Sequence, residues 1–168
     1  TSLLDFEEEE RERKFSISST LVHFEHAGLW FNLIDTPGYP DFIGQAIGAL
    51  HGVETAVIVV AADSGIAVNT RRVFAEAGEA HVGRMILLNK CDHENIDFPT
   101  LLENIQQTFG KQCLPLTLPV GLGTDLDEAI CTLPPAQGKQ AVMDVDAISQ
   151  QLMDAIVEAD EAMMERYL

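Results

Sequence analysis

An α/β fold, a mostly parallel sheet with helices on both faces, is predicted by three observations. Short apolar runs at 55–61 and 85–88 are typical of strands, and stretches with apolar residues on one helical face, at 42–50 and 98–109, are typical of helices. Strands and helices alternate, which indicates parallel strands joined by right-handed crossovers. The 168 residues, 46% of them hydrophobic, suffice to bury one core.

The first part of the chain predicts an exposed segment followed by a hairpin. The charged run over residues 5–13 is typical of a solvated helix face or a mobile loop. Two strand-like runs, at 15–25 and 29–34, flank the short turn Ala27-Gly28. Runs of this kind around a glycine-containing turn indicate an antiparallel hairpin.

Alternating strands and helices follow. Gly52 is a natural stop for the first helix, and the continuously apolar run 55–61 predicts a strand buried on both faces, as does the run 85–88. Asn69 is expected to cap the second helix, and Asp97 is expected to cap the helix over 98–109.

The last third of the chain is expected to contain one strand, one irregular stretch and one long helix. Residues 114–120 are a strand candidate that two prolines weaken. Glycines and prolines over 121–144 predict an irregular surface insertion. The chain closes with an amphipathic helix over about 145–167, whose apolar face includes Met163 and Tyr167.

The charge balance and the cysteines limit the function classes. With 27 acidic and 10 basic residues the net charge is −17, which argues against a stand-alone binder of DNA or other nucleic acid. No apolar run reaches the roughly 18–20 residues that span a bilayer, so no membrane partner is expected. The three cysteines fit no zinc pattern, which favours a reduced, cytoplasmic setting.

Polar tetrapeptides follow two of the predicted strands. DTPG at 35–38 follows the strand 29–34, and NKCD at 89–92 follows the strand 85–88. Ligands of α/β sheets bind beyond the carboxyl ends of the strands. Either tetrapeptide alone also fits an ordinary turn, but the two together, in this order, indicate a shared ligand site.

These tetrapeptides resemble the third and fourth motifs of the guanine-nucleotide-binding domain of P-loop GTPases. ERERKFSI at 10–17 is similar to the ERERGITI segment of translational GTPases. LPVG at 118–121 and the closing EADEAMMERYL at 158–168 resemble segments of elongation factor G. Ribosome-protection factors and a peptide-release GTPase share most of these motifs.

The resemblance covers residues 5–121 and 145–168. It implies the G domain of a P-loop GTPase, in an elongation-factor-G-like protein that binds GTP and Mg²⁺ and hydrolyses GTP to GDP and phosphate on the ribosome. The chain 1–168 would be a partial G domain, incomplete at its N-terminus, with 121–144 as its irregular insertion.

The fourth motif is expected to read the base. The Asp92 carboxylate can accept hydrogen bonds from N1–H and N2–H₂ of guanine, whereas adenine offers no such donor pair, so the wrong base would leave buried polar groups unpaired. Asn89 would tie the loop together and reach the purine, and the stem of Lys90 would cover one face of the base.

The third motif, which comprises Asp35, Thr36, Pro37 and Gly38, is expected to read the phosphates. Asp35 would hold a water on Mg²⁺, and the Gly38 N–H would contact the γ-phosphate, a contact that vanishes with GDP. Ser16 aligns with the family's Mg²⁺-binding threonine. Ser18, Ser19 and Thr20 lie close enough to leave that alignment open.

Two departures from the family pattern bear on activity. The sequence contains no Gly-x-x-x-x-Gly-Lys-Ser/Thr loop, and the fifth motif is missing, so the isolated chain is expected to bind GTP weakly or not at all and to be inactive. The family's water-positioning histidine is replaced by Tyr39, so slow or differently triggered hydrolysis is expected.

Two function classes other than a GTPase bear on this sequence. The alternative is a nucleotide-sensing or ribosome-docking relative with little or no hydrolysis, which the missing phosphate loop and Tyr39 favour modestly. A dinucleotide-dependent oxidoreductase would need G-x-G-x-x-G after its first strand, and the sequence has none.

Overall fold

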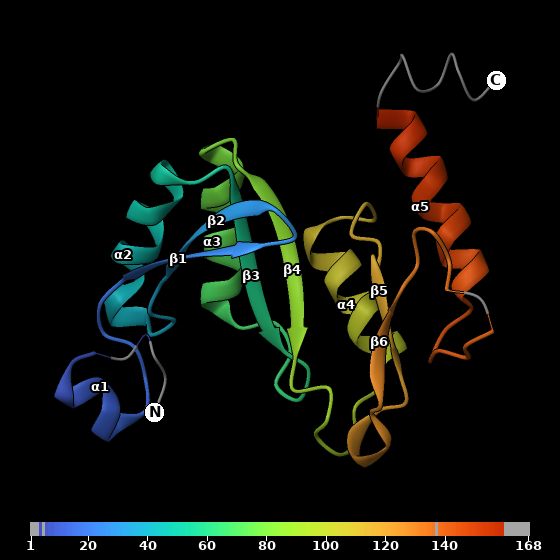
Figure 1. Ribbon diagram of the computed structural model, residues 1–168, viewed down its shortest axis with the longest axis horizontal. Helices are drawn as coiled ribbons and strands as arrows, with labels where there is room; N and C mark the ends of the chain where they lie inside the picture. Colours follow the sequence, from blue (N-terminus) through green and yellow to red (C-terminus); the bar gives the residue numbers. More distant parts are fainter. Residues whose placement is uncertain (1–3, 5, 137, 160–168) are drawn as a thin grey trace. The chain divides into compact units, whose positions relative to one another are not determined.

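The computed structural model describes residues 4, 6–136 and 138–159, and Figure 1 shows the course of the chain. Helices and strands alternate over most of it, as predicted for an α/β fold. In chain order the elements are α1 (Glu8–Arg13), β1 (Thr20–His26), β2 (Leu29–Asp35), η1 (Pro40–Phe42), α2 (Ile43–Ala49), η2 (Leu50–Gly52), β3 (Thr55–Ala61), α3 (Val68–Glu79), β4 (Gly83–Asn89), α4 (Phe98–Phe109), β5 (Thr117–Val120), η3 (Gly123–Asp125), β6 (Glu128–Cys131) and α5 (Val145–Ala159).

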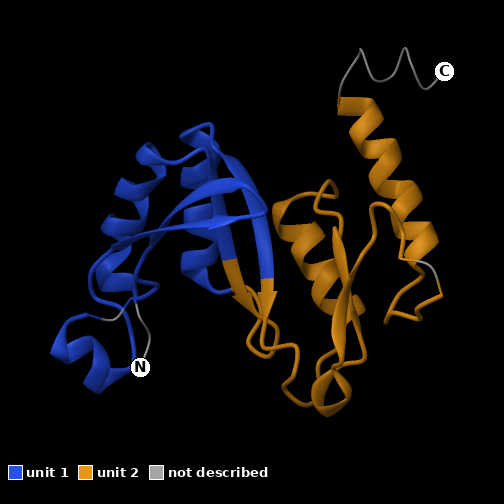
Figure 2. Cartoon of the chain, in the orientation of Figure 1, with its two compact units in different colours: residues 1–58, 67–87 blue, residues 59–66, 88–168 orange. Residues whose placement is uncertain are grey.

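The chain divides into two units, which Figure 2 colours separately. Unit 1 comprises Thr1–Ile58 and Ala67–Leu87, and unit 2 comprises Val59–Ile66 and Leu88–Leu168. The strands β3 and β4 each begin in unit 1 and end in unit 2.

The predicted antiparallel hairpin is confirmed in unit 1. β1 pairs with β2 in a register that ends at Thr20 opposite Asp35. Ala27 and Gly28 both have positive φ, 51° and 76°, as a two-residue type I′ turn requires. The hairpin places Asp35, the first residue of the DTPG motif, at the end of β2.

β3 and β4 are parallel neighbours, as the strand–helix–strand pattern predicts. Near the start of the strands the N–H of Gly83 donates to the carbonyl of Glu54, and at their end the N–H of Ala62 donates to the carbonyl of Asn89, both at 2.8 Å. The two arrows point the same way in Figure 1. The segments that follow β3 and β4 therefore leave the pair at the same end.

The prediction that these strands are buried on both faces is wrong. In β3, Val57 and Val59 are 49% and 55% exposed, while the residues between and beside them are buried. In unit 1 the buried Ala56 packs with Leu50 and with Ala77 of α3. Successive side chains of a strand point to opposite faces, so the helix-facing residues are buried and their neighbours are not.

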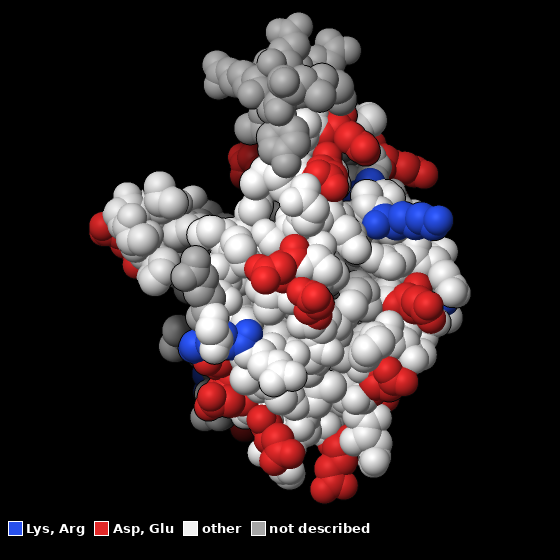
Figure 3. Space-filling view, turned by 90° about the vertical axis from the view of Figure 1, so that its right-hand side faces the viewer, with Lys and Arg blue, Asp and Glu red and all other residues white. Residues whose placement is uncertain are grey.

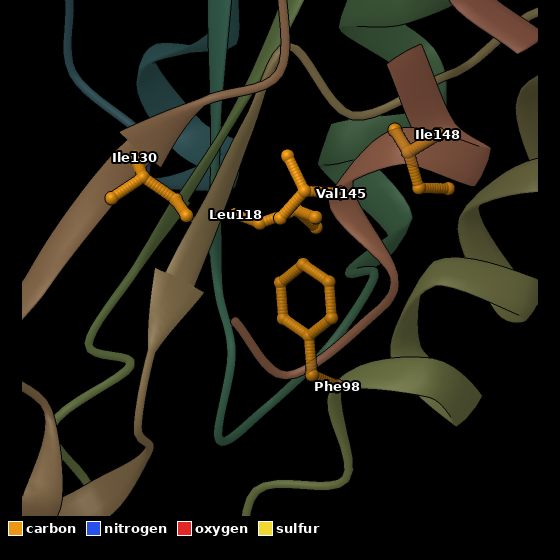
Figure 4. Close-up of a cluster of buried hydrophobic side chains, with 5 residues drawn as sticks. All are labelled: Phe98, Leu118, Ile130, Val145 and Ile148. Carbon is orange, nitrogen blue, oxygen red and sulfur yellow. The ribbon is translucent and has the colours of Figure 1, made fainter. Parts of the chain in front are cut away.

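A separate apolar cluster forms the core of unit 2. β5 pairs antiparallel with β6, with Leu118 opposite Ile130. These two side chains meet Phe98 of α4 and Val145 and Ile148 at the start of α5, as Figure 4 shows. The cluster thus joins two strands and two helices that lie far apart in the sequence.

The stretch 121–144 is more regular than predicted, because it contains η3 and β6. Ile130 of β6 is only 4% exposed and belongs to the core of unit 2. A four-residue strand between glycines and prolines has too little periodicity to be read from sequence. That the stretch is an insertion relative to the family stays a prediction.

Of the two predicted helix caps, Asp97 is confirmed and Asn69 is not. Asp97 caps α4 as predicted: its carboxylate accepts from the N–H of Thr100 at 3.1 Å and from the Thr100 hydroxyl at 2.7 Å. The Asn69 prediction is wrong, because Ala67 is the N-cap of α3 and Asn69 lies inside the first turn.

The final helix, α5, is described over Val145–Ala159. The predicted continuation to 167, with Met163 and Tyr167, lies outside the described residues. Within the described part of the chain, no helix combines the length and the apolar character that a membrane crossing requires.

The change Asp97→Ala should destabilise the first turn of α4 by about 1 kcal/mol, because the cap bond to Thr100 is lost. Hydrogen exchange of the first-turn amides of α4 should then speed up about fivefold. The control Glu103→Ala removes a charge from the exposed face of the same helix and should leave these rates unchanged. Equal rates in both variants would show that the cap bond contributes nothing.

Candidate functional site

The predicted site residues fall into two groups, one in each unit. Unit 1 brings the segment around Ser16 together with the DTPG turn and Tyr39. Unit 2 holds the NKCD loop. That the two groups share one ligand stays a prediction.

The DTPG turn leaves the hairpin at a buried proline and then becomes exposed. Asp35 and Thr36 are half-buried, Pro37 is fully buried, and Gly38 is exposed. A Cβ added at Gly38 would meet no atom within 4 Å, so the space beside its backbone is open to a ligand. The carbonyl of Gly38 accepts a hydrogen bond from Nδ2 of Asn69 at 3.3 Å.

Asn69 is a contributor to this turn that sequence patterns miss. Its position near the start of α3 suggests a cap, but its amide instead holds the carbonyl of Gly38, 31 residues earlier in the chain. The bond ties the DTPG turn to α3 and so restricts the backbone at Gly38, whose N–H is predicted to contact the γ-phosphate.

An aromatic pair joins the two segments of the site in unit 1. The rings of Phe15 and Tyr39 lie with their centroids 4.6 Å apart and their planes tilted by 36°. Tyr39 is 51% exposed, so its side chain is packed on one side and open on the other. The residue at the family's histidine position therefore contacts the residue that precedes Ser16.

The backbone after Ser16 is held by a buried carboxylate. Glu10 of α1 is 0% exposed, and its Oε1 accepts from the N–H of Ile17 at 2.8 Å and of Ser18 at 3.0 Å. Its Oε2 accepts from the N–H of Glu7 at 3.1 Å. These donors, Ser18 and Ile17 foremost, keep the pKa of Glu10 below its usual value.

In unit 2 two backbone groups of the NKCD loop are hydrogen-bonded, one to a side chain of the loop and one to Gly123. Oδ1 of Asn89 accepts from the N–H of Lys90 at 2.9 Å, and Lys90 has a left-handed conformation with φ 61°. The carbonyl of Cys91 accepts from the N–H of Gly123 at 2.9 Å. Asn89, Lys90 and Asp92 are all exposed, so the side chains expected to bind the base are accessible.

Gly123 is a close neighbour of this loop. It has φ 62°, and a Cβ at this position would lie 3.3 Å from the carbonyl oxygen of His93. A larger residue would strain the backbone and crowd the loop, so glycine suits this contact.

A side-chain bridge also links the loops that follow β3 and β4. Nδ1 of His93 is hydrogen-bonded to Oδ2 of Asp63 at 2.8 Å, and the Ser64 hydroxyl donates to Oδ1 of Asp63 at 2.9 Å. The bond from Ser64, followed by that from His93, keeps the pKa of Asp63 below its usual value. The strand-end rule could have found Asp63, because it follows the apolar run 55–61.

Comparisons with known proteins identify translation factors as relatives of this chain. The chain is 32% identical over 180 residues to an elongation factor G-like protein of Mycobacterium tuberculosis, across 100% of this chain and 25% of that protein. It is 33% identical to elongation factor G of Mycoplasma pneumoniae, across 77% of this chain and 19% of that protein. It is 30% identical to peptide chain release factor 3 of Aromatoleum aromaticum, across 84% of this chain and 27% of that protein.

The fold has a counterpart among solved structures. A crystal structure of a Thermus thermophilus protein matches with a TM-score of 0.87 and 28% identity, over 99% of this chain and 27% of that one. The chain thus spans about a quarter of the length of the relatives it matches. Residues 1–164 match the model of the elongation factor Tu GTP binding domain, and the chain belongs to that family.

Proposed function

We propose that the chain is a part of the GTP-binding domain of an elongation-factor-G-type translational GTPase, a cytoplasmic protein that hydrolyses GTP to GDP and phosphate on the ribosome. The observation that carries this proposal is the family match over 1–164, combined with DTPG and NKCD at strand ends. The relatives named elongation factor G and peptide chain release factor 3 support the translational role.

Base selection rests on the loop after β4. Asp92 accepts two hydrogen bonds from N1–H and N2–H₂ of guanine, so adenine leaves the carboxylate unpaired. Asn89 closes the loop through its bond to the N–H of Lys90, and the exposed Lys90 stem covers one face of the base.

Phosphate recognition rests on the DTPG turn and the Ser16 segment. The open backbone of Gly38 donates to the γ-phosphate of GTP, a group that GDP lacks. Thr36 and Pro37 shape the turn, and Pro37 is buried beneath it.

The donors in unit 1 suit Mg²⁺, which when bound neutralises charge on the phosphates. Asp35, acting through water, and the Ser16 hydroxyl are hard oxygen donors. Among the described residues, no three His, Cys, Asp or Glu side chains gather as a metal cluster.

The acidic surface of this chain bears on which ribosomal components, RNA or protein, it would contact. On the face drawn in Figure 3, Asp and Glu are widely spread and Lys and Arg are few, in keeping with the net charge of −17. Carboxylates repel RNA phosphates. This face is therefore better suited to ribosomal protein than to RNA, whose contacts would come from other surfaces of the full-length protein.

A second candidate function is nucleotide sensing or ribosome docking with little or no hydrolysis. The observation that favours it is Tyr39, which replaces the family's histidine and packs on Phe15. A phenol is longer than imidazole and a poorer base, so it would position the attacking water less well. Turnover by the full-length protein separates the two functions.

Asp92→Asn in the full-length protein should weaken GTP binding by roughly 10- to 100-fold, because the amide sets a donor against N2–H₂ of guanine. The same change should favour xanthosine triphosphate, whose C2 carbonyl accepts from the amide. Titration calorimetry measures both affinities. The control Glu94→Gln removes a nearby exposed charge and should change neither, and unaltered GTP binding by Asp92→Asn would remove the base-reading role.

Tyr39→His should raise ribosome-stimulated GTP hydrolysis by roughly 10- to 100-fold, because imidazole orients the attacking water better than a phenol does. Single-turnover phosphate release measures the rate. Tyr39→Phe keeps the ring contact with Phe15 and should show no such gain. If the histidine variant is no faster than wild type, Tyr39 does not limit the reaction.

A further inference from the structure

The backbone of Ile17–Ser19, just after Ser16, is held from two sides by side chains of unit 1. The Glu10 carboxylate, on α1, accepts hydrogen bonds from the N–H groups of Ile17 and Ser18. The Gln45 amide, on α2, accepts from the N–H of Ser19 and donates to the carbonyl of Ile17. Three consecutive N–H groups and one carbonyl are thus bound by two side chains.

The Glu10 carboxylate is fully buried, so it needs hydrogen-bond donors from the protein. A buried charge is costly unless it is hydrogen-bonded, and the three N–H donors of Glu7, Ile17 and Ser18 meet that need. One oxygen binds the start of α1 and the other binds the segment after Ser16. The carboxylate therefore fixes the segment to α1.

The Gln45 contacts resemble one rung of a β-ladder. Its Nε2 donates to the carbonyl of Ile17 at 2.8 Å, and its Oε1 accepts from the N–H of Ser19 at 2.6 Å. Only a primary amide offers a donor and an acceptor side by side in this way. Because α2 follows the DTPG turn through η1, Gln45 links the Ser16 segment to the helix that follows the presumed γ-phosphate contact.

We propose that Glu10 and Gln45 are positioning residues that hold Ile17–Ser19, and with it Ser16, in an ordered conformation before a γ-phosphate is bound. The part played by Ser16 rests on the proposed function. All six hydrogen-bonding groups belong to the protein, so these bonds need no atom of the nucleotide. This differs from switch segments that phosphate and Mg²⁺ contacts alone order.

Such preorganisation has a consequence for nucleotide choice. A segment already in its binding conformation loses little conformational freedom when GTP arrives. Loss of either side chain would add that ordering cost to GTP binding and not to GDP binding, because GDP has no γ-phosphate for the segment to meet. The ratio of GTP to GDP affinity should therefore report on Glu10 and Gln45.

The first test is hydrogen exchange of the full-length protein without nucleotide, read on peptides that cover residues 15–20. In wild type the three amides should be protected. Glu10→Gln should speed the exchange of Ile17 and Ser18, and Gln45→Ala should speed that of Ser19, each by about tenfold. Glu12→Gln on α1 and Gln107→Ala on α4, both at exposed positions, are the matched controls. Unprotected wild-type amides, or variants that exchange like wild type, would overturn the proposal.

The second test compares the affinities of these variants for GDP and for a non-hydrolysable GTP analogue, with Mg²⁺. The analogue affinity should fall about tenfold while the GDP affinity holds, and an equal fall in both would overturn the positioning role. If Glu10→Gln loses the fold, seen as lost protection in α3, Gln45→Ala carries both tests, since position 45 is exposed and the change removes both of its bonds. A wild type that binds neither nucleotide overturns the proposed function, whereas unprotected amides overturn this inference.

Discussion

The parallel pairing of β3 with β4 sets the course of the loop that we propose to bind the base. The bond from the N–H of Ala62 to the carbonyl of Asn89 lies at the end of the pair, and Lys90 then turns the chain with φ 61°. The bridge between Asp63 and His93 joins the segments that leave the two strands. Asp92 lies between these bonded residues in the sequence and is exposed.

In unit 1 the loops of the site are held by side chains that bind backbone groups. Glu10 and Gln45 hold Ile17–Ser19, and Asn69 holds the carbonyl of Gly38. Bonds of this kind fix the path of a loop through its backbone groups. The rings of Phe15 and Tyr39 add a direct contact between the segment before Ser16 and the DTPG turn.

Sequence patterns predict the parts of this structure that depend on neighbouring residues. The hairpin follows from its turn, the β3–β4 pair from alternating strands and helices, and the Asp97 cap from its place just before the helical stretch 98–109. They do not predict the bonds of Asn69 and Gln45, because partners 26 to 31 residues apart are chosen by tertiary packing. A continuous apolar run likewise does not say how many faces of β3 are covered. The roles of the site residues, and their convergence on one ligand, stay predictions.

A crystal structure of the full-length protein with Mg²⁺ and a non-hydrolysable GTP analogue tests most directly whether both strand-end motifs serve one nucleotide. The account predicts the Asp92 carboxylate on N1 and N2 of guanine and the Gly38 N–H on the γ-phosphate of the same molecule. A nucleotide whose base lies away from Asp92, or whose γ-phosphate lies away from Gly38, would contradict it.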